Sequence, residues 1–169
     1  HDRACAAGIS GVPLLVFRVA LPIWSSMRHN LKVQAVVRES ADTISVWVSG
    51  RNLAALDVKG GQFFGWRFLT RDRWWQSHPY SISIGPDARY LRITVKDLGD
   101  HSRGLATLKP GTRVVAEGPY GLFTADERRT DRVLLIAGGV GIAPVRSILD
   151  DLPPQVPVDI LFRARRPEG

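Results

Sequence analysis

Cysteine is almost absent from this sequence of 169 residues, in which Cys5 is the only one. One thiol excludes an internal disulfide, a cysteine-rich zinc site and an iron–sulfur cluster held by this chain alone. The four histidines, His1, His29, His78 and His101, have no spacing that would gather them around a metal. We therefore predict no metal site, and the scarcity of cysteine fits a reducing, cytoplasmic environment.

A complete membrane-spanning run is also missing, because such a helix needs about 20 apolar residues. The longest candidate, residues 9–24, is broken by two prolines and an arginine. It is either a buried N-terminal helix or the end of a membrane helix followed by an interfacial stretch with Trp24 and Arg28. We expect residues 1–30 to form a membrane-proximal apolar segment, and the absence of an initiating methionine leads us to expect further chain upstream.

Acidic residues are outnumbered, 16 against 23 lysines and arginines, which gives a net charge of +7. The arginines are scattered along the chain and form no stripe interleaved with aromatic residues. No recognition helix or strand platform accompanies them, so a nucleic-acid partner is not expected. Solvated side chains, an anionic membrane surface or a phosphate-bearing cofactor explain the excess.

Residues 31–124 contain short segments in which apolar and polar residues alternate, as in half-buried strands. These segments are residues 31–39, 44–50, 62–69, 79–84, 91–95 and 112–117. Six short strands separated by turn residues predict an antiparallel six-stranded barrel or a sandwich. One short helix is expected at residues 102–108.

The pattern changes after residue 131. Residues 133–137 are all apolar, as in a strand buried on both faces. A helix with one apolar stripe follows from Pro144 to Leu152, and residues 158–162 resemble a second buried strand. We expect residues 131–169 to be the N-terminal part of a Rossmann-like α/β nucleotide-binding domain, and an incomplete one, since one strand–helix–strand unit cannot form a doubly wound sheet.

The loop between the first of these strands and the helix has the pattern Gly139-x-Gly141-x-x-Pro144. Glycines let a phosphate approach the backbone, and a helix N-terminus supplies free N–H groups. The loop therefore indicates a pyrophosphate site, with a tight strand-to-helix turn as the alternative. It departs from G-x-G-x-x-G, so an ordinary Rossmann dehydrogenase is not the best match.

Four motifs follow one another in the order His78 to Ser81, Gly99 to Ser102, Gly118 to Gly121 and Gly139 to Pro144. In this order, and across residues 31–169, they resemble the ferredoxin–NADP reductase superfamily. The His-Pro-aromatic form is most similar to the ferric reductase and NADPH oxidase branch, whose flavin domain follows a haem-bearing membrane domain. The resemblance implies an FAD-binding β-barrel at residues 31–124.

It also implies roles for single residues. Tyr80 would lie against the isoalloxazine ring and Ser81 near flavin N5, as the two residues closest to the chemistry. His78 would stand near the diphosphate or ribityl chain, where soluble relatives use arginine. The full set expected to bind FAD or the nicotinamide nucleotide is His78, Pro79, Tyr80, Ser81, Val95, Lys96, Gly99, Ser102, Gly139, Gly141 and Pro144.

Plainer interpretations stay open for these positions. Tyr80 fits a core aromatic residue, Ser81 a solvent-facing strand residue and His78 a turn residue. Gly118 to Gly121 fits a turn between domains. The cluster Arg163, Arg165 and Arg166 points to an adenosine 2′-phosphate, hence NADPH over NADH, or to an exposed basic loop.

The expected function is that of an NAD(P)H-dependent, FAD-containing oxidoreductase that passes electrons to a membrane haem at the cytoplasmic face. A soluble cytoplasmic reductase serving ferredoxin, flavodoxin or another small electron carrier is the nearest alternative. A partner subunit that binds no flavin is the alternative of another class. We expect the chain to bind FAD and to turn over NAD(P)H poorly by itself.

Overall fold

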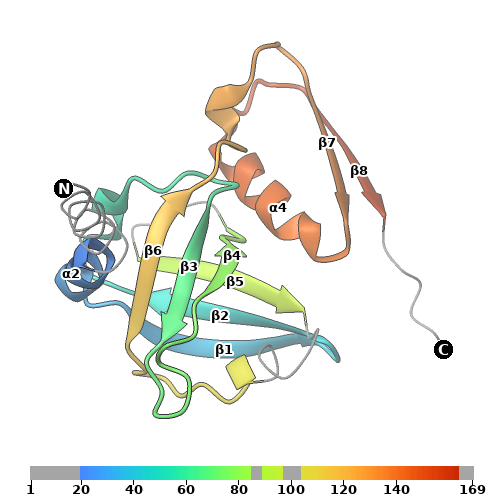
Figure 1. Ribbon diagram of the computed structural model, residues 1–169. Helices are drawn as coiled ribbons and strands as arrows, with labels where there is room; N and C mark the ends of the chain where they lie inside the picture. Colours follow the sequence, from blue (N-terminus) through green and yellow to red (C-terminus); the bar gives the residue numbers. More distant parts are fainter. Residues whose placement is uncertain (1–19, 85–88, 97–103, 164–169) are drawn as a thin grey trace, which may run out of the picture.

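The computed structural model describes residues 20–84, 89–96 and 104–163 (Figure 1). Its helices and strands are, in chain order, α2 (Leu21–His29), β1 (Lys32–Ser40), β2 (Thr43–Ser49), the 3-10 helix η2 (Leu53–Leu56), β3 (Phe63–Phe68), β4 (His78–Ser81), β5 (Tyr90–Lys96), β6 (Val114–Tyr120), η3 (Ala125–Glu127), β7 (Val133–Gly138), η4 (Gly139–Gly141), α4 (Ile142–Asp151) and β8 (Val158–Arg163).

The first six strands form two three-stranded antiparallel sheets, in the orders β1-β2-β5 and β4-β3-β6. The sheets meet at two isolated bridges, Lys32 with Arg113 and Ile82 with Ile93. The six antiparallel strands are thus confirmed, but they do not join into one continuous barrel sheet. At the first bridge, three backbone hydrogen bonds also join Leu31 and Val33 to residues 111–114.

The core lies between the two sheets and follows from the alternation seen in the sequence. In β3 and β5 every second residue is buried. Phe64, Trp66, Ile82 and Ile93 are almost completely buried, and their rings and branched chains fill the centre. Phe64 and Trp66 pack with ring centroids 5.3 Å apart, so aromatic side chains anchor the β3 side of the core.

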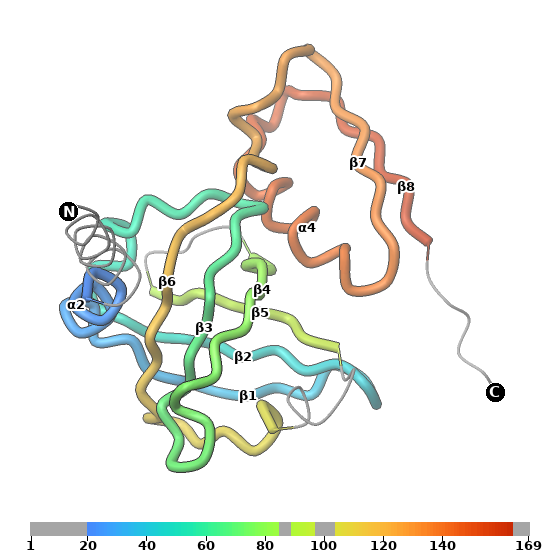
Figure 2. The backbone as a smooth tube through the Cα atoms, viewed as in Figure 1, coloured from blue at the N-terminus to red at the C-terminus, as the bar shows by residue number. Residues whose placement is uncertain are grey.

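The second unit is the parallel pair β7–β8 with α4, which confirms the predicted strand–helix–strand unit. In Figure 2, α4 lies between this pair and the antiparallel sheets. The prediction that β7 is buried on both faces is wrong for the described residues, because Leu134 is 63% and Ile136 is 67% exposed. α4 covers the face that carries Leu135 and Ala137, and the opposite face stays bare.

The two units touch where the segment before β3 meets α4. The Gly61 N–H donates a 2.9 Å hydrogen bond to Ser147 Oγ, and the Gly60 N–H donates to the Asp151 carboxylate. A Cβ added to Gly60 would lie 2.1 Å from the Ser147 carbonyl oxygen. Only glycine allows backbone and helix to approach this closely, so Gly60 sets the spacing between the units.

The described end of the expected membrane-proximal segment is α2, and it is not buried in a core. Its polar residues face the sheets: the Ala116 N–H donates to Ser26 Oγ, and His29 Nδ1 lies 2.8 Å from the Arg51 carbonyl oxygen. Trp24 (59% exposed) and Met27 (73% exposed) face outward. Within the described ranges, none of the helices has the length and apolar character needed to span a bilayer.

Candidate functional site

The seam between β4 and β5 opens on one side of its single bridge. Ile82 pairs with Ile93, and this antiparallel register extended along the strands sets Tyr80 opposite Val95 and Pro79 opposite Lys96. Neither of these two described pairs forms a bridge. The strands therefore separate beside four of the residues that the sequence predicts to bind a cofactor.

Tyr80 and His78 lie on the inner side of this opening. Their cross-strand partners are Phe64 and Trp66, which are buried, whereas Tyr80 and His78 are only partly buried. Their two rings stack at 19° with centroids 6.4 Å apart. Trp66 Nε1 donates a 3.0 Å hydrogen bond to the Tyr80 carbonyl oxygen. The core thus fixes the strand that presents both rings to the opening.

Burial shifts the titration of both side chains in ways that matter for a ligand. It lowers the pKa of His78 below its ordinary value, so the imidazole is mainly neutral at pH 7. It raises the pKa of Tyr80, so the phenol keeps its proton throughout the physiological range. Near neutral pH, the opening is therefore lined by hydrogen-bonding rings with little charge.

The neighbouring positions are arranged differently. Ser81 pairs with Phe63 and lies on the opposite face of β4 from Tyr80, because side chains alternate along a strand. Val95 is buried in the core, so its side chain is turned away from any outer ligand and only its backbone borders the opening. The roles expected for Ser81 and Val95 in cofactor binding stay predictions.

Lys96 is held at the end of β5 by Asp42. Its ammonium lies 2.9 Å from the Asp42 carboxylate, and this contact lowers the pKa of Asp42 to about 2. Gly99 and Ser102, predicted to cradle a diphosphate, lie outside the described residues, as do Arg165 and Arg166. Arg163 ends β8. The roles expected for these positions stay predictions.

The glycine loop forms η4 and leads directly into α4, next to β5. Gly139 has φ +54°, and a Cβ added to Gly139 or Gly141 would meet nothing within 4 Å. No side chain caps the N-terminus of α4, and Pro144 lies in its first turn, as predicted. The loop thus presents free backbone to open space.

A cavity of about 210 Å³ separates the start of α4 from the surface of β2 and β5. Its floor is a chain of hydrogen bonds that links Ser45, Thr94 and Ser83, with Arg92 Nε donating to Ser83 Oγ at 3.0 Å. Sequence reasoning missed these residues. Alternating polar positions on β2 and β5 were visible, but which of them face α4 depends on packing between the units.

The Gly118 to Gly121 motif ends β6 and leads to η3, at the connection between the two units. Tyr120 packs against Phe63 with ring centroids 5.7 Å apart, and its hydroxyl donates to Glu117. A Cβ on Gly118 would lie 2.8 Å from the Phe64 ring. The motif therefore serves the packing of β6 at this connection.

A family model described as an FAD-binding domain matches residues 26–124. Among curated proteins, an NADPH oxidoreductase of Mycobacterium tuberculosis is 31% identical over 89% of this chain and 42% of its own length. Respiratory burst oxidase homolog protein D of Arabidopsis thaliana is 32% identical over 56% of this chain and 13% of its own length. The chain therefore spans less than half the length of these relatives.

Solved structures show the same fold. The flavohem-like FAD/NAD-binding domain of a nitric oxide dioxygenase from Vibrio cholerae has a TM-score of 0.65 and 26% identity, over 82% of this chain and 63% of that one. A ferredoxin NADP+ reductase from Neisseria gonorrhoeae with bound FAD and NADP has a TM-score of 0.67 and 21% identity, over 82% and 58%.

The family match covers the two antiparallel sheets and ends just before the second unit. It confirms the resemblance drawn from the four motifs, and with it FAD as the flavin cofactor. The chain belongs to the ferredoxin–NADP reductase superfamily of NAD(P)H-dependent FAD oxidoreductases and contains its FAD-binding domain.

Proposed function

We infer that the chain passes electrons from NAD(P)H through FAD, with the isoalloxazine ring seated in the opening between β4 and β5. The observation that carries this proposal is the splayed seam itself. Two strands that should continue as a ladder separate where Tyr80 faces Val95, and a planar ring with polar edges fits between such strands. The stacked, uncharged rings of His78 and Tyr80 suit an aromatic ligand.

The free backbone at Gly139 and Gly141 supports the nicotinamide nucleotide as the second ligand. Open space around both glycines and an uncapped helix N-terminus suit a pyrophosphate. The bound cofactors supply the chemistry, a hydride transfer from nicotinamide to flavin, and the protein binds and orients them. Tyr80 supplies an apolar face, Ser81 a hydroxyl at the strand edge, and Gly60 holds the two units at a fixed spacing.

For the acceptor, we propose a haem in a membrane, at its cytoplasmic face. The outward Trp24 and Met27 of α2 support this, since Arg28 lies over the Trp24 ring and tryptophan with arginine is typical of membrane interfaces. Similarity to a respiratory burst oxidase homolog agrees. Similarity to a glycine betaine monooxygenase reductase subunit favours the alternative, a small electron carrier as acceptor.

An absorption spectrum of the purified chain, taken after addition of FAD and desalting, tests the flavin site. Retained bands at about 370 and 450 nm, which belong to oxidised flavin itself, are the expected result. A folded but colourless protein would contradict the proposal and favour the partner subunit that binds no flavin.

Changing Ser81 to alanine is expected to slow flavin reduction by NAD(P)H about fivefold, the effect of losing one hydrogen bond worth about 1 kcal/mol. FAD should stay bound, because Tyr80 and the backbone remain. Stopped-flow absorbance of the full-length protein measures the rate, with Ser49→Ala on β2 as the matched control. Equal rates in wild type and Ser81→Ala would remove Ser81 from the mechanism.

Changing both Trp24 and Met27 to serine is expected to lower binding to vesicles of phosphatidylcholine and phosphatidylserine about tenfold. Both side chains are exposed, so their apolar area is available to the bilayer interface. Co-sedimentation measures the bound fraction, and Trp74→Ser, at an exposed tryptophan of another loop, is the control. Undiminished binding of the double variant would favour the small electron carrier.

A further inference from the structure

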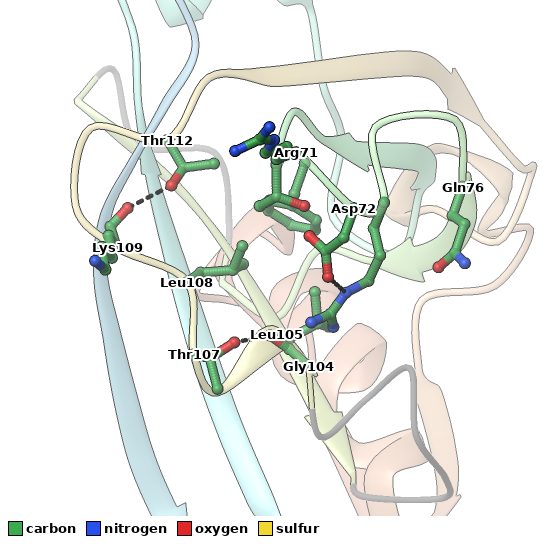
Figure 3. Close-up of a pocket in the computed structure, with 12 residues that line it drawn as sticks. Arg71, Asp72, Gln76, Gly104, Leu105, Thr107, Leu108, Lys109 and Thr112 are labelled. Atoms are coloured by element: carbon green, nitrogen blue, oxygen red, sulfur yellow. Dashed lines mark hydrogen bonds and ion pairs between the residues drawn. The ribbon is translucent and has the colours of Figure 1, made fainter.

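One end of the seam between β4 and β5 is fastened, and the other end borders a cavity. The Ile82–Ile93 bridge marks the fastened end, and the two strands separate from there toward Pro79 and Lys96. The turn that leads into β4 borders a cavity of about 460 Å³ (Figure 3). The separation of the strands along the opening therefore depends on how firmly the bridged end is held.

The residue pair next to that bridge, Ser83 and Arg92, is joined through every polar group of the serine. The Ser83 N–H and hydroxyl both donate to the Arg92 carbonyl oxygen, at 2.8 and 3.2 Å. In return, Arg92 Nε donates to Ser83 Oγ at 3.0 Å, and Arg92 Nη2 donates to the Ser83 carbonyl oxygen at 3.2 Å. We call these contacts the Ser83–Arg92 clamp. It holds the backbone that directly follows β4 against β5.

The guanidinium of the clamp is itself positioned by β2. Arg92 pairs with Trp47 in the β2–β5 register, and Arg92 Cζ lies 5.3 Å from the centroid of the Trp47 ring. A cation over an aromatic face is attracted to it. On the other side, the cavity of about 210 Å³ lies between the clamp and the start of α4. The clamp therefore ties the end of β4 to β5 and β2, and its position is set by these strands.

The clamp consists of polar groups that cannot easily lose their partners. Ser83 is 1% exposed, and its hydroxyl also accepts a 2.9 Å hydrogen bond from Thr94 Oγ1. Removing this hydroxyl takes the acceptor away from Arg92 Nε and from Thr94 Oγ1. Buried donors without an acceptor favour a rearrangement in which they reach water or another partner. At this place, such a rearrangement moves the end of β4 relative to β5.

We propose that Arg92 is a positioning residue of the flavin site, which acts through Ser83 to hold the end of β4 against β5 and so sets the width of the opening. This proposal rests on the flavin site proposed above. Arg92 lies on the outer face of β5, beyond the Ile82–Ile93 bridge, and acts without contacting the flavin. Its effect is preorganisation, because a ring that enters an opening of fixed width does not have to order two strands.

Titration of the whole chain with FAD, followed by flavin fluorescence, tests this role. For Ser83→Ala we expect the FAD Kd to rise about tenfold, because a competent width populated in about one molecule in ten raises the apparent Kd by the inverse of that fraction. Arg92→Leu should have a similar effect. Arg92→Lys should recover part of the affinity, since an ammonium can still donate to Ser83 but has no planar fork.

Ser45→Ala is the matched control. Ser45 is as buried as Ser83, and its Oγ lies 3.0 Å from Thr94 Oγ1, in the same chain of hydrogen bonds. This contact joins β2 to β5, which a continuous ladder already holds together. Ser45→Ala and Ser83→Ala should therefore lower the midpoint of urea unfolding by similar amounts, whereas only Ser83→Ala should change the FAD Kd.

The outcomes separate the clamp from the flavin site. An FAD Kd that stays at the wild-type value in Ser83→Ala and Arg92→Leu, or that rises equally in Ser45→Ala, overturns the positioning role and leaves the flavin site standing. If Ser83→Ala does not fold, the comparison of Arg92→Leu with Arg92→Lys decides in its place, and equal affinities in those two variants overturn the proposal. If the wild-type chain binds no FAD, the flavin site itself fails, and this inference fails with it.

Discussion

Replacing Trp66 by alanine is expected to lower the free energy of unfolding by about 3 to 5 kcal/mol, the usual cost of deleting a large buried aromatic side chain. Trp66 is 1% exposed and packs between Phe64 and Phe68 in the core. Its indole also holds the Tyr80 carbonyl oxygen, so FAD retention should be lost with the fold. Urea denaturation followed by circular dichroism, with desalting after FAD addition, measures both effects.

Two further variants separate packing from the hydrogen bond. Trp66→Phe keeps most of the ring volume and loses the donor to Tyr80, so about 1 kcal/mol is expected from the hydrogen bond. Trp74→Ala, at an exposed tryptophan, should stay within about 0.5 kcal/mol of wild type. A Trp66→Ala variant as stable as Trp74→Ala would show that the β3 side of the core is not packed as described.

Replacing Gly60 by valine is expected to slow flavin reduction by NAD(P)H about 100-fold or more in the full-length protein, with FAD still bound. The added Cβ would lie 2.1 Å from the Ser147 carbonyl oxygen and 2.4 Å from its carbonyl carbon. Both atoms belong to the backbone of α4, so the helix must move away from the sheets. A displacement of about 1 Å at reacting groups costs a factor of this size.

Stopped-flow reduction measures that rate, and the flavin absorbance after desalting reports FAD binding. Ser147→Ala is the matched control, because it removes the oxygen that accepts from the Gly61 N–H without forcing the two units apart. Its effect should be much smaller. Reduction of Gly60→Val at the wild-type rate would show that the spacing between the units does not govern hydride transfer.

Most of the secondary structure could be predicted from the sequence, because it depends on local patterns. The alternation of apolar and polar residues predicted β2 and β5, and one apolar stripe predicted α4. The exposure of one face of β7 could not be predicted from the sequence. An apolar run indicates that a strand favours apolar contacts, but it does not show whether another element covers each face. Leu134 and Ile136 are exposed because α4 packs against the other face of β7.

The candidate site could be predicted only in part. Motif order identified His78 and Tyr80, which the structure stacks together, and Gly139 and Gly141, which it leaves open to solvent. The opening of the β4–β5 seam depends on how the two sheets diverge, and no local pattern encodes this divergence. The role expected for Val95 stays a prediction, and it would fall to the backbone, since the side chain faces the core.

The order of the elements along the chain has a consequence for biosynthesis. The opening and all six antiparallel strands come from residues 32–120, ahead of β7, α4 and β8. Ribosomes add about 5 to 20 residues per second, so the 43 residues from 121 to 163 take about 2 to 9 s. The strands that border the proposed flavin site are therefore synthesised several seconds before the nucleotide unit is complete.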